Sequence, residues 1–108
     1  GIVVSMADGY YQASGKPPFV NVHAMVGTAQ MGGQLYNAHF NNTPMVVTAG
    51  MRDTSVFSDD WSLAGKPGVS QADATRQFTK IAWDVRNPAS LPWAIRRALK
   101  VATTPPGG

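Results

Sequence analysis

The sequence predicts an α/β fold built on a doubly wound parallel sheet. Two segments, Phe19–Ala24 and Met45–Ala49, are short, apolar and rich in valine, and helical patterns lie before, between and after them. Parallel strands need crossover connections, which are usually helices and almost always right-handed. The length of 108 residues suits one domain with one core. We therefore expect residues 1–108 to form a single, partial domain.

The first expected element is a helix over Ile2–Ala13. Its apolar residues recur at the spacing of one helix face, at Ile2, Met6, Tyr10 and Ala13. A glycine and two prolines at positions 15–18 then end the pattern. The first strand, Phe19–Ala24, follows at once and reads as buried, because prolines precede it and Gly27 comes after it.

A second helix is expected to begin with Thr28 as its cap. Its apolar residues are Met31, Leu35, Tyr36 and Ala38, and it is expected to end at Asn41, Asn42 and Pro44. The second strand, Met45–Ala49, comes next. It is another short run with valines and no breaking residue, which is typical of a buried parallel strand.

The remaining chain predicts a loop, a strand and a helix. Arg52–Gly68 mixes Asp, Ser, Gly, Lys and Pro with isolated apolar residues, which indicates a long loop with at most a helical turn. Lys80–Val85 alternates weakly and predicts a third strand. A final helix carries an apolar stripe at Leu91, Ile95, Leu99 and Ala102. Three strands are few for a doubly wound sheet, so we expect further strands before Gly1 and after Gly108, and thus a sheet incomplete at both ends.

Composition and charge narrow the class of protein. Only 14% of the residues are charged, against about 25% in an average soluble domain, which indicates surfaces that are covered in an assembly. The net charge is +3, but only Arg96, Arg97 and Lys100 are grouped, so we expect a solvated helix face and no nucleic-acid partner. No apolar run approaches the roughly 20 residues of a membrane span, so we expect no membrane partner. The absence of cysteine excludes thiolate chemistry.

Candidate site residues lie at the carboxyl ends of the first two strands, where open α/β sheets bind ligands. These stretches are His23–Gln30 and Gly50–Asp53. His23 can exchange a proton near neutral pH, although a histidine that only hydrogen-bonds within the domain is an open alternative. The glycine-rich segment Gly27–Gly33 suits either an anion or close helix packing, and His39 is expected at the surface. No spacing predicts a metal site in this chain.

Two longer runs resemble a known family. MADGYYQASGKPPFVNVHAMVGTAQMGG (6–33) and NAHFNNTPMVVTAG (37–50) resemble the pyrimidine-binding domain of thiamine-diphosphate-dependent enzymes. The resemblance is closest to the benzoylformate decarboxylases, with the acetolactate synthases second. It covers nearly the whole chain and is weakest over residues 54–72. It implies the flavodoxin-like, doubly wound fold of that domain.

The resemblance also implies a site and its cofactor. The chain resembles a fragment of a 2-oxo-acid decarboxylase that binds the aminopyrimidine side of thiamine diphosphate and acts on a small 2-oxo acid. His23 matches the catalytic histidine that exchanges protons during decarboxylation in benzoylformate decarboxylases. By the same match Gly27, Thr28 and Gln30 lie on the cofactor-binding side. The family holds magnesium and the diphosphate with a separate domain, which this chain lacks.

Further expectations follow from the family. Its activating glutamate would fall immediately before Gly1, and this chain contains no glutamate, so we expect the 108 residues alone to be inactive. We expect a homo-oligomer, dimer or tetramer, in the cytoplasm. Acetolactate synthases carry a different turn in place of His23, which favours decarboxylation, whereas Ala24 and Met25 depart from the benzoylformate decarboxylase pattern. A carboligase of the acetolactate synthase kind, or a non-catalytic self-associating α/β module, stays open as an alternative.

Overall fold

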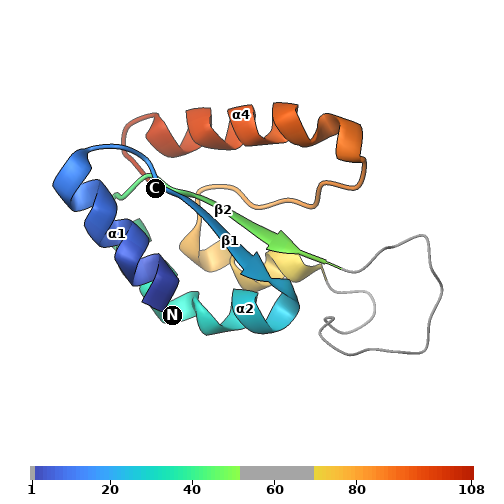
Figure 1. Ribbon diagram of the computed structural model, residues 1–108, viewed down its shortest axis with the longest axis horizontal. Helices are drawn as coiled ribbons and strands as arrows, with labels where there is room; N and C mark the ends of the chain where they lie inside the picture. Colours follow the sequence, from blue (N-terminus) through green and yellow to red (C-terminus); the bar gives the residue numbers. More distant parts are fainter. Residues whose placement is uncertain (1, 52–69) are drawn as a thin grey trace.

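The sheet of the protein consists of two parallel strands. In a computed structural model, which describes residues 2–51 and 70–108, strand β1 (Phe19–His23) pairs with strand β2 (Val46–Gly50). The register runs from Phe19 opposite Val46 to His23 opposite Gly50. Figure 1 shows helix α4 on one side of the strands and α1 and α2 on the other. The predicted α/β class with parallel strands is confirmed.

Helix α1 (Ile2–Ser14) confirms the first predicted helix. It ends where Gly15 adopts a left-handed φ of 69° and its N–H donates to the carbonyl of Tyr11 at 2.8 Å. Glycine is favoured in this C-terminal position because it has no Cβ to clash. The chain then turns through Pro17 and Pro18 into β1.

The crossover from β1 to β2 consists of two helices, α2 (Ala24–Gln30) and α3 (Gly32–Phe40), where the sequence predicted one. The prediction that Thr28 caps a helix is wrong, because α2 begins directly after β1. The Thr28 hydroxyl lies inside the helix and donates to the carbonyl of Ala24 at 2.8 Å. The break between the helices falls at Met31, whose side chain is buried, so core packing fixes the kink.

The main core lies between β1, α1 and α3. One cluster of buried side chains joins the three elements to the start of β2: Val4, Ala7, Val20, Met31, Leu35, Ala38 and Met45. A polar contact reinforces it, because the buried Thr43 hydroxyl donates to Asp8 Oδ1 at 2.6 Å. Residues 2–50 therefore form a closed βαβ unit with a helix packed on it.

The predicted third strand over Lys80–Val85 is wrong for the described structure. Residues 81–87 are irregular and pair with no described strand. Side chains hold this segment in place of a ladder, since Arg76 Nη1 donates to the carbonyl of Ala82 and Lys80 Nζ donates to the carbonyls of Val101 and Thr104. The predicted loop at 52–68 lies outside the described residues.

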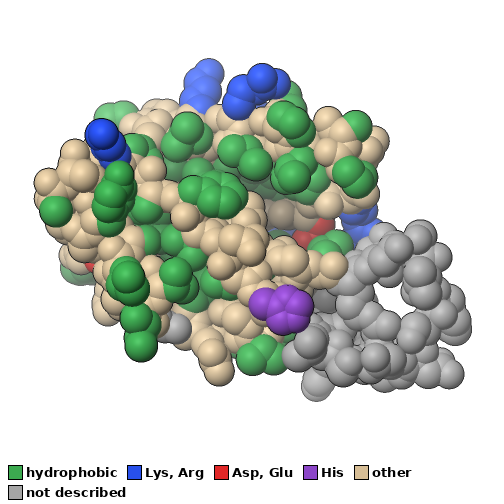
Figure 2. Space-filling view, in the orientation of Figure 1, with side chains coloured by type: hydrophobic (Ala, Val, Ile, Leu, Met, Phe, Trp, Pro, Cys, Tyr) green, Lys and Arg blue, Asp and Glu red, His purple; other side chains and the backbone are tan. Residues whose placement is uncertain are grey.

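Helix α4 (Leu91–Thr103) confirms the last predicted helix, and short 3-10 turns precede it at Gln71–Ala74, Arg76–Phe78 and Pro88–Ser90. Its packing is loose, because Ala94 and Ala102 are buried while Leu91 and Leu99 are each 43% exposed. Figure 2 shows lysine and arginine side chains along the outer side of the molecule above many exposed hydrophobic ones. Beneath α4 a cavity of about 560 Å³ separates the helix from β2 and residues 80–86.

Candidate functional site

His23 stands at the carboxyl end of β1, where the strand changes into a helix within one residue. The backbone of His23 is still extended, with φ −98° and ψ 117°, and the next residue, Ala24, opens α2 in the left-handed region at φ 51°. This conformation is uncommon for a residue with a Cβ. The sharp turn leaves the His23 side chain exposed, with no bond that caps α2. The structure thus places the imidazole at the edge of the sheet where ligands of α/β folds bind.

Gly27 is explained by packing. A Cβ on Gly27 would lie 3.1 Å from Val22 Cβ, a tight contact, so a side chain there would require α2 and β1 to move apart by a few tenths of an ångström. Gly32 and Gly33, in contrast, have no close neighbour that a Cβ would strike. Close helix packing, the alternative to an anion site for Gly32 and Gly33, therefore does not explain those two glycines, whereas it does apply to Gly27.

Thr28 and Gln30 differ in their surroundings. Thr28 is 3% exposed, and its hydroxyl both donates to Ala24 and accepts a hydrogen bond from Gln71 Nε2 at 3.2 Å. Gln30, at the other end of α2, is exposed. Gly27 and Thr28 thus brace α2 against the sheet, whereas His23 and Gln30 present their side chains to the solvent. The roles predicted for these four residues stay predictions.

Sequence reasoning missed Gln71, which follows the long loop and belongs to no motif. Its Nε2 donates to Thr28 Oγ1 and to the carbonyl of Gly50, both at 3.2 Å. One amide therefore connects the 3-10 turn to α2 and to the end of β2. The pairing of a buried threonine with a later amide gives no local signal in a sequence, because 43 residues separate the two partners.

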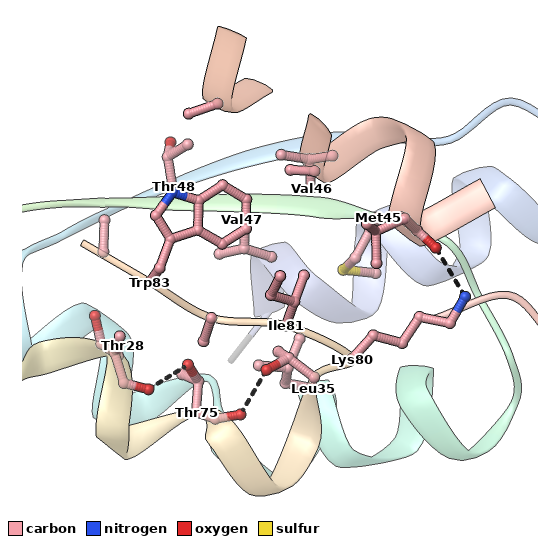
Figure 3. A pocket seen from close by; sticks show the side chains of 18 of the residues that line it. Thr28, Leu35, Met45, Val46, Val47, Thr48, Thr75, Lys80, Ile81 and Trp83 are labelled. Atoms are coloured by element: carbon pink, nitrogen blue, oxygen red, sulfur yellow. Dashed lines mark hydrogen bonds between the residues drawn. The ribbon is translucent and has the colours of Figure 1, made fainter. Parts of the chain in front are cut away.

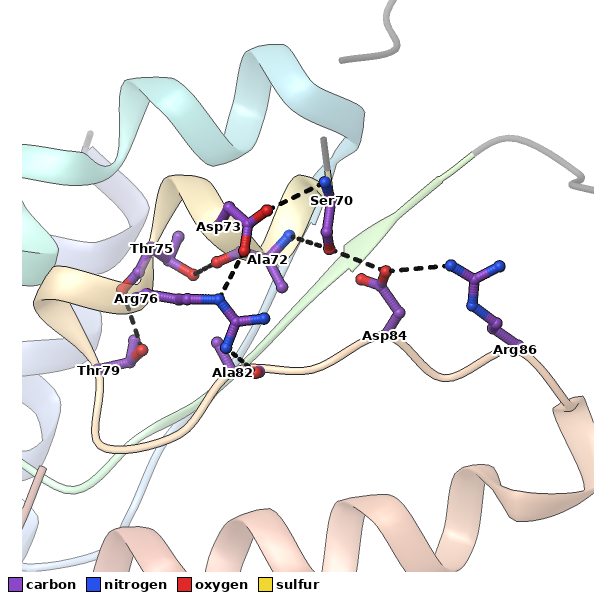
Figure 4. Close-up of polar contacts among 9 residues, drawn as sticks. All are labelled: Ser70, Ala72, Asp73, Thr75, Arg76, Thr79, Ala82, Asp84 and Arg86. Atoms are coloured by element: carbon purple, nitrogen blue, oxygen red, sulfur yellow. Dashed lines mark hydrogen bonds and ion pairs between the residues drawn. The ribbon is translucent and has the colours of Figure 1, made fainter. Parts of the chain in front are cut away.

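A polar network surrounds the same turn (Figure 4). Ser70 caps it reciprocally with Asp73, and the Ser70 hydroxyl also donates to Asp84 at 2.8 Å. Arg76 Nε donates to Asp73 Oδ1 at 2.6 Å. This hydrogen bond is the largest cause that lowers the pKa of Asp73 below its ordinary value of 3.8. Desolvation opposes it, and the hydrogen bond from the Ser70 amide lowers the pKa further. The network fixes the segment on which Gln71 stands.

The other residues that the sequence singled out, Gly50–Asp53 and His39, add little to the description of the site. Arg52 and Asp53 lie outside the described residues, so only Gly50 and Met51 of that stretch are placed. His39, expected at the surface, is half-buried in α3 with Nδ1 enclosed and unpaired among the described residues. Within residues 2–51 and 70–108 no group of three His, Asp or Glu side chains could hold a metal ion. In the same residues no helix combines the length and apolar character of a membrane span.

Comparison with known proteins identifies a benzoylformate decarboxylase and acetolactate synthases as relatives of this chain. Benzoylformate decarboxylase of Pseudomonas aeruginosa is 36% identical over 106 residues, which are 98% of this chain and 20% of that protein. The mitochondrial acetolactate synthase catalytic subunit of Aspergillus candidus is 39% identical over 100 residues, 92% of this chain and 14% of that protein. The corresponding subunit of Saccharomyces cerevisiae is 34% identical over the same shares. The chain spans a fifth or less of the length of these relatives.

A solved structure supports the same relationship. The X-ray structure of a candidate thiamin diphosphate-dependent enzyme from Mycobacterium smegmatis superposes with a TM-score of 0.86 at 32% identity, and covers 97% of this chain and 20% of its own. The family described as "Thiamine pyrophosphate enzyme, N-terminal TPP binding domain" matches residues 1–78. The chain therefore belongs to the thiamine pyrophosphate enzymes and carries their N-terminal TPP binding domain.

Proposed function

We propose that this chain is the part of a thiamine-diphosphate-dependent 2-oxo-acid decarboxylase that faces the aminopyrimidine of the cofactor. The observation that carries the proposal is the position of His23, which is exposed at the carboxyl end of β1 beside the end of β2. An imidazole placed there can give and take a proton next to a bound ligand. The similarity to benzoylformate decarboxylase supports the reaction class.

The described residues fit one side of the cofactor. His23 and Gln30 are exposed at the two ends of α2, whereas Thr28 has its hydroxyl engaged within the chain. We therefore assign His23 to proton transfer and Gln30 to polar contact, while Gly27 and Thr28 hold α2 at its short distance from β1. The cofactor supplies the electron sink that decarboxylation of a 2-oxo acid requires.

His23 would act on the side of the substrate. Loss of carbon dioxide leaves electron density on the former carbonyl carbon, and a protonated imidazole can deliver the proton that this carbon needs. The neutral imidazole can then accept the hydroxyl proton as the aldehyde leaves. Magnesium and a partner subunit, both implied by the family, would come from outside the residues described for this chain.

The alternative is a carboligase like the acetolactate synthases, which a specific observation favours. Identity to the Aspergillus candidus acetolactate synthase subunit, 39% over 100 residues, is as high as to the decarboxylase. In a carboligase the carbon that has lost carbon dioxide must form a bond to a second 2-oxo acid. A proton donor at His23 would protonate this carbon first, and the aldehyde would be released before the second acid could react. The role of His23 therefore decides between the two reactions.

The test is His23→Ala in a polypeptide of the length of the relatives, assayed with thiamine diphosphate and magnesium. We expect the rate of aldehyde release from benzoylformate or pyruvate to fall about 100-fold or more, the usual contribution of an acid or base. His39→Ala is the matched control, since it removes the other histidine of these 108 residues, and should change the rate less than about twofold. The pH–rate profile should lose one of its limbs only in the His23 variant.

A rate for His23→Ala within about twofold of the unchanged protein would overturn the proposed role. Consumption of the 2-oxo acid by the unchanged protein without release of aldehyde would instead support the carboligase. For the 108 residues alone we expect no turnover above a blank, because the chain contains no glutamate to activate the aminopyrimidine.

A further inference from the structure

The turn that follows His23 contains one residue in an unusual backbone conformation. Ala24 has a left-handed φ of 51°, which a residue with a Cβ seldom adopts. Such a conformation persists where the surrounding structure holds it against the steric cost. The turn also sets the direction in which α2 leaves β1, and thus the groups that surround the His23 imidazole. Contacts that fix Ala24 therefore fix the surroundings of His23.

Two hydrogen bonds in series connect Gln71 to this turn. Gln71 Nε2 donates to the Thr28 hydroxyl at 3.2 Å, and the same hydroxyl donates to the carbonyl of Ala24 at 2.8 Å. A hydroxyl has a single proton, so a bond received from Gln71 leaves that proton for the carbonyl and orients it. Thr28 is buried, which limits the access of water to both bonds. The two bonds thus fix the peptide plane that follows the left-handed residue.

The same amide also reaches the neighbouring strand. Gln71 Nε2 donates to the carbonyl of Gly50 at 3.2 Å, and Gly50 is the residue of β2 that lies opposite His23 in the parallel register. A primary amide carries two N–H groups, one for each of these acceptors. Gln71 therefore contacts the end of β2 directly and the start of α2 through Thr28, which are the two elements next to His23.

Gln71 is itself fixed by the turn on which it stands. Ser70, directly before it, forms a reciprocal cap with Asp73 (Figure 4). Gln71 and Thr28 both line the cavity beneath α4, and Figure 3 shows the Thr28 side chain at its wall. The backbone of Gln71 is thus held by contacts that do not involve the candidate site, which is what a support for that site requires.

We propose that Gln71 is a positioning residue for His23. Its bond to Thr28 keeps Ala24 in the left-handed conformation, and its bond to Gly50 keeps the end of β2 beside the imidazole. A side-chain amide is neither an acid nor a base near neutral pH, so Gln71 acts through these contacts alone. The inference rests on proton transfer by His23 as the proposed function, but the geometry of Ala24 can be measured without any reaction.

The first measurement is the backbone geometry of Ala24, observed by NMR in the complete 108-residue chain. Gln71→Met keeps the length of the side chain and removes both N–H groups. We expect the amide-to-Hα coupling and the Cα chemical shift of Ala24 to move away from left-handed values, and the ring signals of His23 to shift with them. Gln77→Met, an exposed position on the same segment, is the matched control and should leave these signals unchanged.

The second measurement is a double-mutant cycle on the rate of aldehyde release, in a polypeptide of the relatives' length with thiamine diphosphate and magnesium. Gln71→Met should lower kcat by about 10- to 100-fold, the effect of a misplaced reacting group, and should change KM less than about twofold. In a His23→Ala background the same substitution should change kcat less than about twofold, because no imidazole remains to be positioned. A loss of stability alone would lower the rate in both backgrounds.

Ala24→Gly tests the link between the hydrogen bonds and the left-handed residue. Glycine adopts a positive φ without steric cost, so Gln71→Met should lower kcat by less than about threefold when Ala24 is already replaced. A loss as large as with alanine at this position would overturn the proposal. So would equal losses with and without the His23 imidazole, or Ala24 signals that Gln71→Met leaves unchanged.

Two further outcomes keep the inference separate from the proposed reaction. If Gln71→Met does not fold, Thr28→Val interrupts only the branch to Ala24 and should shift the same signals. Unchanged signals in that variant would refute the inference. If His23→Ala does not slow the reaction, the proposed function fails, and the Ala24 signals alone still decide whether Gln71 holds the turn.

Discussion

In residues 2–50 the apolar side chains of α1, β1 and α3 close over one another, whereas in residues 70–108 helix α4 spans a hollow. Leu35 and Val4 of the first region are 3% and 0% exposed, while Leu99 and Trp93 of the second are 43% and 55% exposed. The first region has a closed core, although apolar side chains on its outer faces, such as Met6, Phe19 and Phe40, are 68%, 56% and 75% exposed. The second region has an amphipathic helix and an irregular segment that pairs with no described strand, and polar side chains hold this segment in place.

The difference bears on function. The candidate site lies on the well-packed region, since His23 ends β1 and α2 is fixed by Gly27 and Thr28. Gln71 of the second region reaches across to the same place through its bonds to Thr28 and Gly50. The geometry of the site therefore depends on Gln71, a residue of the less tightly packed second region, staying in position.

The largest expected effect is in the core. Leu35→Ala should lower the free energy of unfolding by about 2–5 kcal/mol, because it removes a buried side chain and leaves a cavity. Leu99→Ala, the same change in α4, should cost less than about 1 kcal/mol, since that side chain is already 43% exposed. Urea unfolding measures both. Equal losses would mean that the two regions are packed alike and would remove the comparison.

A smaller effect is expected at the contact between α1 and the start of β2. Thr43→Val keeps the shape but removes the hydroxyl that donates to Asp8, and leaves a part-buried carboxylate with a weaker partner, Gln12 at 3.4 Å. The cost should be about 1–3 kcal/mol. Thr103→Val removes an exposed hydroxyl in α4 and should cost about 0.5 kcal/mol or less. Thermal melts that shift equally for both variants would contradict a special role of the Asp8 contact.

The smallest effect concerns the pH response of the second region. The pKa of Asp73 is lowered in the folded chain by Arg76, so this carboxylate contributes stability above its ordinary, unfolded value near 3.8, and the contribution is lost as the pH falls through the lower folded value. Arg76→Gln should raise the pKa of Asp73 towards 3.8. An NMR titration of the side-chain carboxyl carbon measures it, and an unchanged pKa would show that Arg76 is not the cause.

The fold of the first region follows from its sequence because each pattern there has its partner nearby. The helical repeat before Gly15 and the valine-rich runs after Pro18 and Pro44 predicted α1, β1 and β2 within one or two residues. The break at Met31 did not follow, because only the tertiary core shows that this side chain must turn inward.

The second region was harder to predict for a physical reason. The weak alternation of Lys80–Val85 suits a strand, but a strand forms only when a neighbour accepts its hydrogen bonds. The same limit applies to the site. His23 could be found from its place at the end of a strand, whereas Gln71 acts through bonds to residues 21 and 43 positions away, which no local pattern reveals.

The most direct test of the proposed reaction is the stoichiometry of its products in a polypeptide of the relatives' length, supplied with thiamine diphosphate, magnesium and a single 2-oxo acid. A decarboxylase with His23 as proton donor converts each 2-oxo acid into equal amounts of aldehyde and carbon dioxide, and this is the expected result. Release of one carbon dioxide for every two molecules of 2-oxo acid, without free aldehyde, would mean that two acids have been joined, and would contradict the decarboxylase.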